Sequence, residues 1–159
     1  MDLFIVGYVI GWVLQFEAIF LLVPAAVGLC YREYSYSVIY LIVAIICLIV
    51  GSLLKLCKKR KGELYVREGF AAVALAWVAM SVFGALPFVM TGEIPSFVNA
   101  LFETISGFTT TGSSILSDVE ALSRTSLFWR SFTHWLGGMG VFMLILAVLP
   151  LLGDHSINL

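Results

Sequence analysis

Long apolar stretches separated by short polar ones dominate the pattern of this chain. Blocks almost free of charge cover residues 3–29, 38–54, 70–90 and 126–152. A helix rises about 1.5 Å per residue, so each block is long enough to cross most or all of a hydrocarbon core of about 30 Å. The pattern predicts four membrane-spanning helices. The polar connection over residues 30–37 is short, so the first two helices should form an antiparallel pair.

A shorter apolar segment lies between the third and fourth blocks. Residues 97–108 carry large apolar side chains at helical spacing, and Ser96 is suited to cap the start of a helix. Twelve residues reach only about 18 Å, too little to cross the membrane. We expect a half-helix that enters from the outside and stops midway. The alternatives are an interfacial helix that lies flat and a buried core helix.

A hydroxyl-rich run, Thr-Thr-Thr-Gly-Ser-Ser at residues 109–114, follows this segment directly. Irregular backbone at membrane depth is tolerated only where it is buried in protein or lines a watery path. Carbonyl and hydroxyl oxygens can replace the water shell of a potassium ion. Gly112 accepts a positive φ, and the C-terminal end of the half-helix attracts a cation. We therefore expect a potassium filter, although such runs also occur in ordinary loops. The candidate ligands are Thr109, Thr110, Thr111, Gly112 and Ser113.

Composition supports an all-α membrane protein. The chain of 159 residues is 61% hydrophobic and 12% charged, whereas soluble proteins have about 25% charged residues. The net charge of −1 gives no indication of a nucleic-acid partner. Five basic residues lie between Lys55 and Lys61. By the positive-inside rule this loop and the N-terminus are cytoplasmic. The cluster is either an ordinary solvated face or a contact for anionic lipids.

Two glutamates interrupt apolar helices. Glu17 lies near the middle of the first span, where an ionisable residue is a functional hypothesis by default. We expect instead that it faces other helices and is hydrogen-bonded or protonated. Asn99 and Glu103 lie one turn apart on the half-helix. We expect them to support the filter from behind, since a bare charge in the ion path would hold a cation too tightly. The alternative is that Glu103 attracts cations.

Three glycines and a histidine fall in the last span. Gly137, Gly138 and Gly140 favour close helix packing, with a hinge as the alternative. His134 could form a hydrolase triad with Ser131 and Asp118, but no nucleophile motif accompanies it, so we expect no enzyme. The three cysteines lack metal-ligand spacing, so neither a metal site nor a disulfide is expected.

Several motifs in a fixed order resemble the Trk-type potassium uptake family (TrkH and TrkG, with the KtrB proteins as more distant relatives). They are Lys-Gly-Glu-Leu at 61–64, Arg-Glu-Gly-Phe at 67–70, Gly-Ala-Leu-Pro-Phe at 84–88, Phe-Glu-Thr-Ile-Ser-Gly-Phe-Thr-Thr-Thr-Gly at 102–112, and Trp-Leu-Gly-Gly-Met-Gly at 135–140 leading to Leu-Pro at 149–150. The resemblance implies an N-terminal helix pair with a basic cytoplasmic loop over 1–61, outside the pore. It makes 62–159 the first pore repeat, with an outward helix over 66–91, a pore half-helix over 96–108, a filter over 109–114 and an inward helix over 126–152.

The resemblance also implies ligands and partners. The carbonyls of Thr110 and Thr111 would bind K⁺ as the transported ion, with no bound cofactor. A cytosolic TrkA-type nucleotide-binding ring would be the partner, and the protein would cross the bacterial inner membrane several times. Family members carry four repeats around one pore, whereas this chain holds only the first. We expect the remaining repeats to come from a longer chain, or otherwise from further copies. The alternative is a non-conducting assembly or regulatory subunit that pairs with complete transporters.

Overall fold

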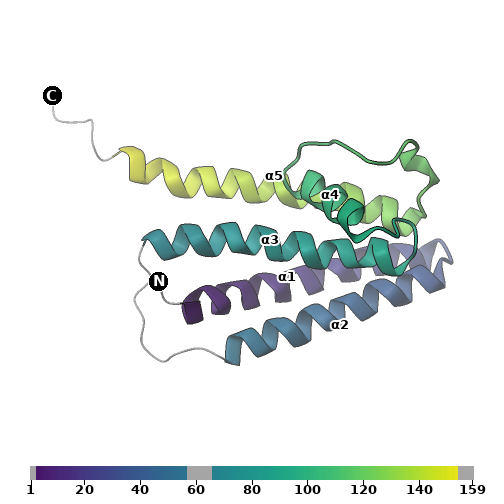
Figure 1. The fold of residues 1–159 in the computed structure, drawn as a ribbon, viewed down its shortest axis with the longest axis horizontal. Coiled ribbons are helices and arrows are strands. Elements are labelled where there is room, and N and C mark those ends of the chain that lie inside the picture. The colour runs from purple at the N-terminus through teal and green to yellow at the C-terminus, as the bar shows by residue number, and fades with distance from the viewer. Residues whose placement is uncertain (1–2, 57–65, 154–159) are drawn as a thin grey trace.

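Five helices and one short 3-10 turn make up the part of the chain that the computed structural model describes, residues 3–56 and 66–153. The elements in chain order are α1 (Leu3–Cys30), α2 (Tyr34–Leu56), α3 (Val66–Met90), α4 (Phe97–Phe108), η1 (Val119–Ala121) and α5 (Arg124–Gly153) (Figure 1). The predicted all-α class is confirmed, and every predicted helix is present. Cys57, most of the basic loop and the 61–64 motif lie outside the described residues.

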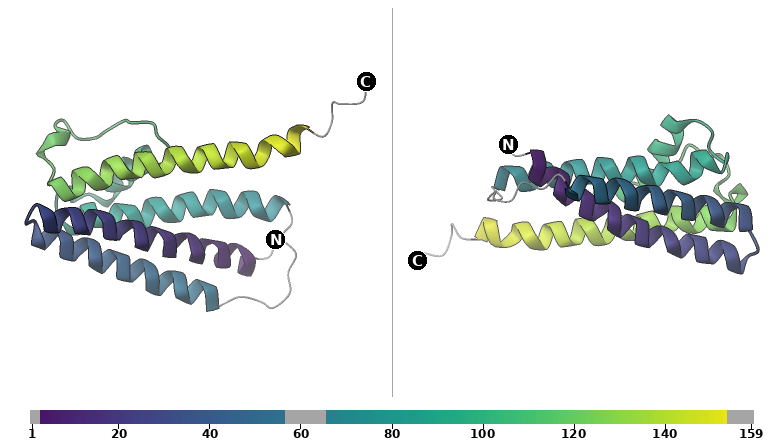
Figure 2. Two further views of the ribbon diagram at one scale, coloured as in Figure 1. Left: turned by 180° about the vertical axis from the view of Figure 1, so that it is seen from behind. Right: turned by 90° about the horizontal axis from the view of Figure 1, so that it is seen from below.

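The four long helices run alongside one another, and α4 lies at one end of the bundle beside α3 and α5 (Figures 1 and 2). The start of α1 and the end of α5 lie at the opposite end from α4. This arrangement separates the molecule into one end that carries the half-helix with its loops, and another that carries the start of α1.

The α1–α2 hairpin is tighter than predicted. Only residues 31–33 connect the two helices, and Arg32 has a φ of 63°. The backbone N–H of Ser37 donates to the Glu33 carbonyl at 3.0 Å. The polar residues that were assigned to the connection therefore form the first turn of α2. Along the hairpin, Gly11 and Gly51 face each other so closely that a Cβ on either would lie 2.7 Å from the other's carbonyl oxygen.

Aromatic side chains form the core where the hairpin meets the later helices. Trp129 of α5 is fully buried, and its indole N–H donates to the Gly84 carbonyl at 3.0 Å. The Tyr40 hydroxyl donates to Ser126 at 3.1 Å. The rings of Tyr40 and Phe108 each meet Trp129 edge to face. Burial of these large rings with satisfied polar atoms stabilises the contact among α2, α3, α4 and α5.

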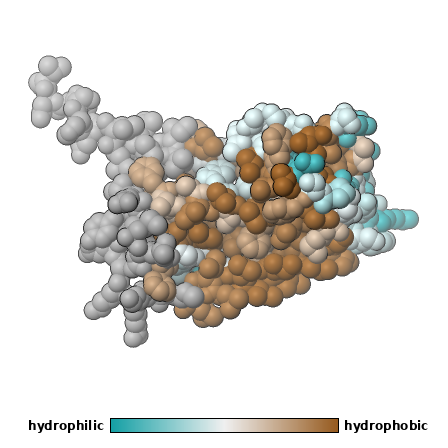
Figure 3. All heavy atoms as spheres, in the orientation of Figure 1, coloured by the Kyte–Doolittle hydropathy of each residue, from teal (hydrophilic) through white to brown (hydrophobic). Residues whose placement is uncertain are grey.

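The outer surface of the helices is apolar. Figure 3 shows hydrophobic side chains over the sides of the long helices and polar ones around α4 and its loops. Ile45, Ile49 and Leu53 on α2 are each more than half exposed. Within the described residues, Val6–Cys30, Tyr34–Leu56 and Gly69–Met90 are long and apolar enough to cross a membrane. Such a surface suits contact with lipid. The helix α5 has 30 residues and is not among these three, so its crossing remains a prediction.

The start of α4 differs from the prediction in one detail. Ser96 holds the capping position with an extended backbone, but its side chain makes no capping bond. Its carbonyl instead accepts the Ala100 N–H at 2.9 Å. The predicted position was right and the predicted role of the hydroxyl was wrong. The return segment after the hydroxyl-rich run also contains η1, which the sequence pattern did not indicate.

Candidate functional site

The loop that follows α4, residues 109–113, begins with a change in backbone conformation. The Thr109 N–H and hydroxyl both donate to the Ile105 carbonyl, at 2.8 and 2.7 Å, so α4 ends in satisfied hydrogen bonds. Thr110 then has a φ of 57° and Gly112 a φ of 78°. A non-glycine residue in this region costs about 1–2 kcal/mol. All five residues of this loop are exposed. The strain at Thr110 therefore has to be offset by contacts elsewhere.

Ser106 supplies several of these contacts. This buried residue donates from its hydroxyl to the Ser113 carbonyl at 2.5 Å. Its own carbonyl accepts the N–H groups of Thr111 at 3.0 Å and Gly112 at 3.4 Å. One residue in the last turn of α4 thus holds the last three residues of the loop. Sequence reasoning missed Ser106, although its place seven residues before Ser113 was a usable signal.

Glu103 ties the far side of the loop to α5. Its side chain is 1% exposed. One carboxylate oxygen accepts a 2.5 Å bond from the Arg130 guanidinium, which forms an ion pair. The other accepts from the Ser114 hydroxyl at 3.1 Å and the Ile115 N–H at 3.2 Å. A buried carboxylate with this many donors is compensated for its lost water. Arg130 was not among the predicted site residues.

Asn99, the other predicted support, does not join this network. Its side chain is exposed. The structure gives it no hydrogen bond within residues 3–56 and 66–153. Of the two polar positions predicted on the half-helix, the structure brings only Glu103 to the loop.

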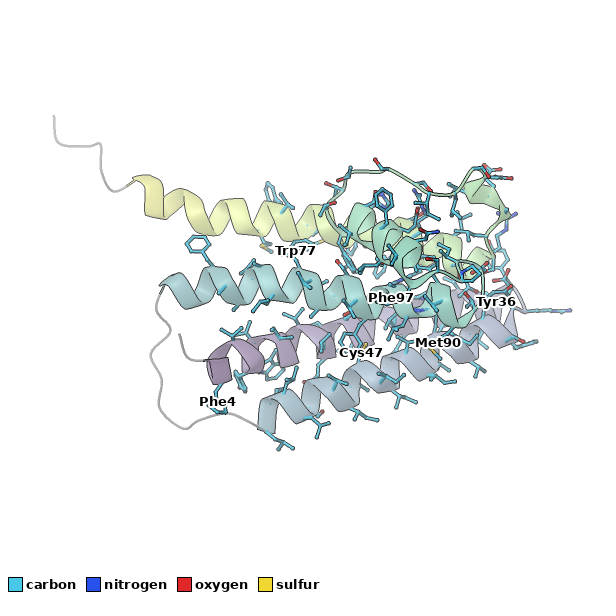
Figure 4. The ribbon with its side chains drawn as sticks, in the orientation of Figure 1. Phe4, Tyr36, Cys47, Trp77, Met90 and Phe97 are labelled. Atoms are coloured by element: carbon cyan, nitrogen blue, oxygen red, sulfur yellow. The ribbon has the colours of Figure 1, made fainter. Side chains whose placement is uncertain are left out.

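Glycines bring α4 against α5. A Cβ on Gly137 would overlap the Phe108 carbonyl, and one on Gly107 would overlap the Thr133 hydroxyl. A Cβ on Gly140 would lie 3.1 Å from the Trp77 ring, which Figure 4 places on the α5 side of α3. Gly138 differs, since its nearest neighbour would be the Thr110 methyl group at 3.9 Å. Two of the three predicted glycines therefore lie in close contacts, and the third faces Thr110 of the loop after α4.

A carboxylate from the α1–α2 connection caps α5. Glu33 accepts bonds from the Arg124 N–H at 3.0 Å, the Thr125 N–H at 2.9 Å and the Thr125 hydroxyl at 2.6 Å. Partial burial of this carboxyl raises its pKa. The bonds from Thr125, with those of Arg124 and its positive charge, outweigh that effect, so the pKa of Glu33 is lowered. A negative charge at a helix N-terminus is favourable. Sequence reasoning missed this cap.

The remaining polar candidates bond locally. His134 Nδ1 lies 2.8 Å from the Arg130 carbonyl, the Ser131 hydroxyl donates to Leu127, and Asp118 accepts the Glu120 N–H. These three residues therefore do not form a triad. Over the described ranges no three His, Cys, Asp or Glu side chains gather as a metal site.

Glu17 was expected to face other helices and to be either hydrogen-bonded or protonated. It faces the other helices as expected and is 1% exposed. However, neither carboxyl oxygen has a hydrogen-bond partner in the part of the chain that the structure describes. The predicted hydrogen bonds are absent there because the groups around it are apolar or engaged elsewhere. This carboxyl differs in that respect from the equally buried Glu103.

Comparisons with known proteins agree with this architecture. The TrkH family profile, described as a cation transport protein, matches residues 36–159. The potassium uptake protein TrkG of Escherichia coli is 37% identical over 150 residues, which cover 94% of this chain and 31% of TrkG. TrkH of the same organism is 38% identical over 142 residues, 87% of this chain and 29% of TrkH.

The crystal structure of the potassium transporter TrkH from Vibrio parahaemolyticus superimposes with a TM-score of 0.87 at 33% identity, over 99% of this chain and 34% of that protein. The chain thus spans about a third of the length of these relatives. The family is one of transporters rather than enzymes, as the sequence predicted. With its apolar helices, the chain is a multi-pass membrane protein that belongs to the TrkH family of cation transport proteins.

Proposed function

We propose that this chain supplies one of four pore repeats for potassium uptake, with residues 109–113 as its part of the selectivity filter. The observation that carries the proposal is the exposed loop at the end of a half-helix. Its backbone is left-handed at Thr110 and Gly112, and Ser106 anchors it. An unstrained surface loop has no need of such restraint. The names of the relatives, potassium uptake proteins, agree with this function.

In this proposal the backbone supplies most of the ligands for the ion. Carbonyl oxygens of Thr110 and Thr111 replace water around K⁺, and the other three repeats complete the ring. The partial negative charge at the end of α4 stabilises the ion. The hydroxyls of Thr109 and Thr111 lie 2.8 Å apart and bond each other, so they hold the loop. The Ser113 carbonyl accepts from Ser106, which makes Ser113 an anchor as well as a candidate ligand.

Glu103 acts as a support in this scheme. Arg130 neutralises its charge, and Ser114 and Ile115 occupy its second oxygen. A carboxylate so engaged does not hold a passing cation. It fixes the segment after the loop instead, so that the filter keeps its spacing as ions enter and leave.

The orientation follows from charge. Lys55 lies near the end of α2 that is away from α4, and the basic residues that follow it in the sequence favour the cytoplasmic side. We therefore place the start of α1 in the cytoplasm of a bacterial cell and α4 toward the outside of its inner membrane. A TrkA-type nucleotide-binding ring would then bind on the cytoplasmic side.

Rubidium uptake into liposomes that contain this chain tests the filter. Gly112→Asp should reduce uptake more than about tenfold, since the side chain adds strain and a charge at the filter. Gly92→Asp is the matched control, because Gly92 has a φ of 77° against 78° for Gly112, and nothing lies within 4 Å of a Cβ at either. Where the unmodified chain takes up rubidium, equal uptake in the two variants would refute the filter assignment.

The particle mass, measured in parallel, separates the two candidate functions. Uptake by a particle of four copies indicates a pore made by this chain alone. A monomer or dimer without uptake calls for the same pair of variants in a longer transporter that contains this repeat. Normal uptake of that transporter with Gly112→Asp would favour a non-conducting subunit, a candidate that the one-third coverage of the relatives keeps open.

A further inference from the structure

Two glutamates of this chain are equally buried but differ in their partners. Glu17 and Glu103 are each 1% exposed. Glu103 binds Arg130 and two further donors. Both oxygens of Glu17 are without a hydrogen-bond partner among the described residues. A buried carboxylate without compensation costs far more free energy than the same group as a neutral acid. The two side chains should therefore carry different charges.

Glu17 lies deep in the membrane-spanning part of α1. It is eleven residues from Val6 and thirteen from Cys30, the ends of the candidate span. At about 1.5 Å per residue, that places it roughly 17 Å from one end and about 20 Å from the other. Water at the membrane surfaces is therefore too far away to hydrate the carboxyl.

The carboxyl points to Gly84 of α3, at the place where α3 also packs on α4, and this meeting of three helices is called the α1–α3–α4 contact. One oxygen of Glu17 lies 3.2 Å from the position that a Cβ on Gly84 would take. A ring carbon of Phe108 and the methyl group of Thr104 lie 3.2 and 3.1 Å from the same point. The absence of a side chain at Gly84 leaves the space that the carboxyl uses. Glu17 thus sits directly behind the last turns of the half-helix.

The groups around Glu17 do not favour a negative charge. The hydroxyl of Thr104 donates to the Ala100 carbonyl instead. From α2, the titratable group is the thiol of Cys47, which is buried beside α1 (Figure 4). The nearest residues of α3 and α4 bring no titratable group. The end of α4 adds a partial negative charge, which opposes a second one.

The charged groups of α5 near this region are engaged elsewhere. Arg130 forms its ion pair with Glu103, and His134 bonds the Arg130 carbonyl. Near Glu17, α5 packs on α4 through Trp129, whose ring contacts that of Phe108. The described residues around Glu17 therefore provide no positive charge to balance it.

We propose that Glu17 is a proton-binding site behind the half-helix, and that the bound proton keeps the α1–α3–α4 contact closed. The exchange is an ordinary acid equilibrium, in which the carboxyl O–H bond breaks and the proton passes to water that enters when this contact opens. The carboxylate that remains places a full negative charge behind Phe108, the residue before the filter loop. That charge would hold a cation at the loop more tightly and slow its release. Proton binding by Glu17 does not rest on the proposed function, whereas its effect on cation release does.

Infrared spectroscopy of the whole chain in lipid bilayers tests the proposal without any ion flux. We expect the carbonyl stretch of a protonated carboxyl at neutral pH, and its loss in Glu17→Gln. Glu103→Gln is the burial-matched control and should keep the band, and Glu33→Gln serves the same purpose if Glu103→Gln does not fold. Wild-type protein without the band at neutral pH would overturn the proposal, as would a band that persists in Glu17→Gln. Because uptake is not measured, a failure here is distinct from a failure of the filter assignment.

Discussion

Gly137→Ala should destabilise the protein, whereas the same change one residue later should not. The two glycines lie in the same helix and gain the same intrinsic helix propensity from alanine, about 1 kcal/mol. At Gly137 the new methyl group would overlap the carbonyl of Phe108, whereas at Gly138 its nearest neighbour would be 3.9 Å away. The pair therefore isolates the cost of moving α4 away from α5.

The size of the destabilisation by Gly137→Ala depends on which atoms have to move. Overpacking a well-filled contact costs about 1–3 kcal/mol when side chains can adjust. The obstacle at Gly137 is main chain at the C-terminal end of α4, so the cost should reach the upper part of that range. After the propensity gain, Gly137→Ala should lose about 1–2 kcal/mol, and Gly138→Ala should gain up to about 1 kcal/mol.

Thermal unfolding in one detergent, followed by tryptophan fluorescence, measures the pair. We expect the midpoint of Gly137→Ala to lie several degrees below wild type and that of Gly138→Ala at or above it. Gly140→Ala should fall between them, because the Trp77 ring at 3.1 Å can shift. Two equal midpoints for Gly137→Ala and Gly138→Ala would show that α4 is not packed on α5 through Gly137.

Three further changes test the contacts around the loop and its outer end. Arg130→Met should lower the free energy of unfolding by about 3–5 kcal/mol, since it leaves the buried carboxylate of Glu103 without its ion-pair partner. Adding Glu103→Gln should restore part of this loss in denaturation assays. A double variant no more stable than Arg130→Met would argue against the ion pair. Ser106→Ala should cost about 1 kcal/mol and reduce rubidium uptake, and unaltered uptake would remove Ser106 from the filter anchor. Folding lowers the pKa of Glu33, so its carboxylate should stabilise the protein above about pH 4.5 and lose that effect as the pH falls further. The difference in melting temperature between wild type and Glu33→Gln should therefore shrink in acid. A difference that widens in acid would contradict the role of Glu33 as a cap of α5.

The long helices could be predicted because each corresponds to a local run of apolar residues. Apolar runs of sufficient length give spanning helices, and the spacing of apolar residues over 97–108 gave the half-helix. The start of α2 was missed because a single residue, Arg32, turns the chain with a positive φ. Nothing in the surrounding composition indicates that conformation.

The site was predictable in its location and not in its contacts. The hydroxyl-rich run after a half-helix indicated the position of the loop, and Glu103 was expected to lie behind it, where it bonds Ser114 and Ile115. Its ion-pair partner is 27 residues away, and the cap of α5 by Glu33 spans more than 90. Such pairings depend on how helices cross, which local periodicity does not describe. The exposure of Asn99 shows the same limit, since one helical turn separates it from a buried residue.

The cap formed by Glu33 also sets an order for assembly during synthesis. Glu33 leaves the ribosome 91 residues before Arg124, whose N–H it binds. The hairpin of α1 and α2 is made of neighbouring segments and can pair as soon as it enters the membrane. The cap that Glu33 forms on α5 acts as a latch between this hairpin and the last helix, and it cannot form until that helix arrives. Chains arrested before residue 124 should therefore leave the Glu33 carboxyl open to water-soluble carboxyl reagents, and longer chains should protect it. Equal labelling at both lengths would show that the latch does not report the arrival of α5.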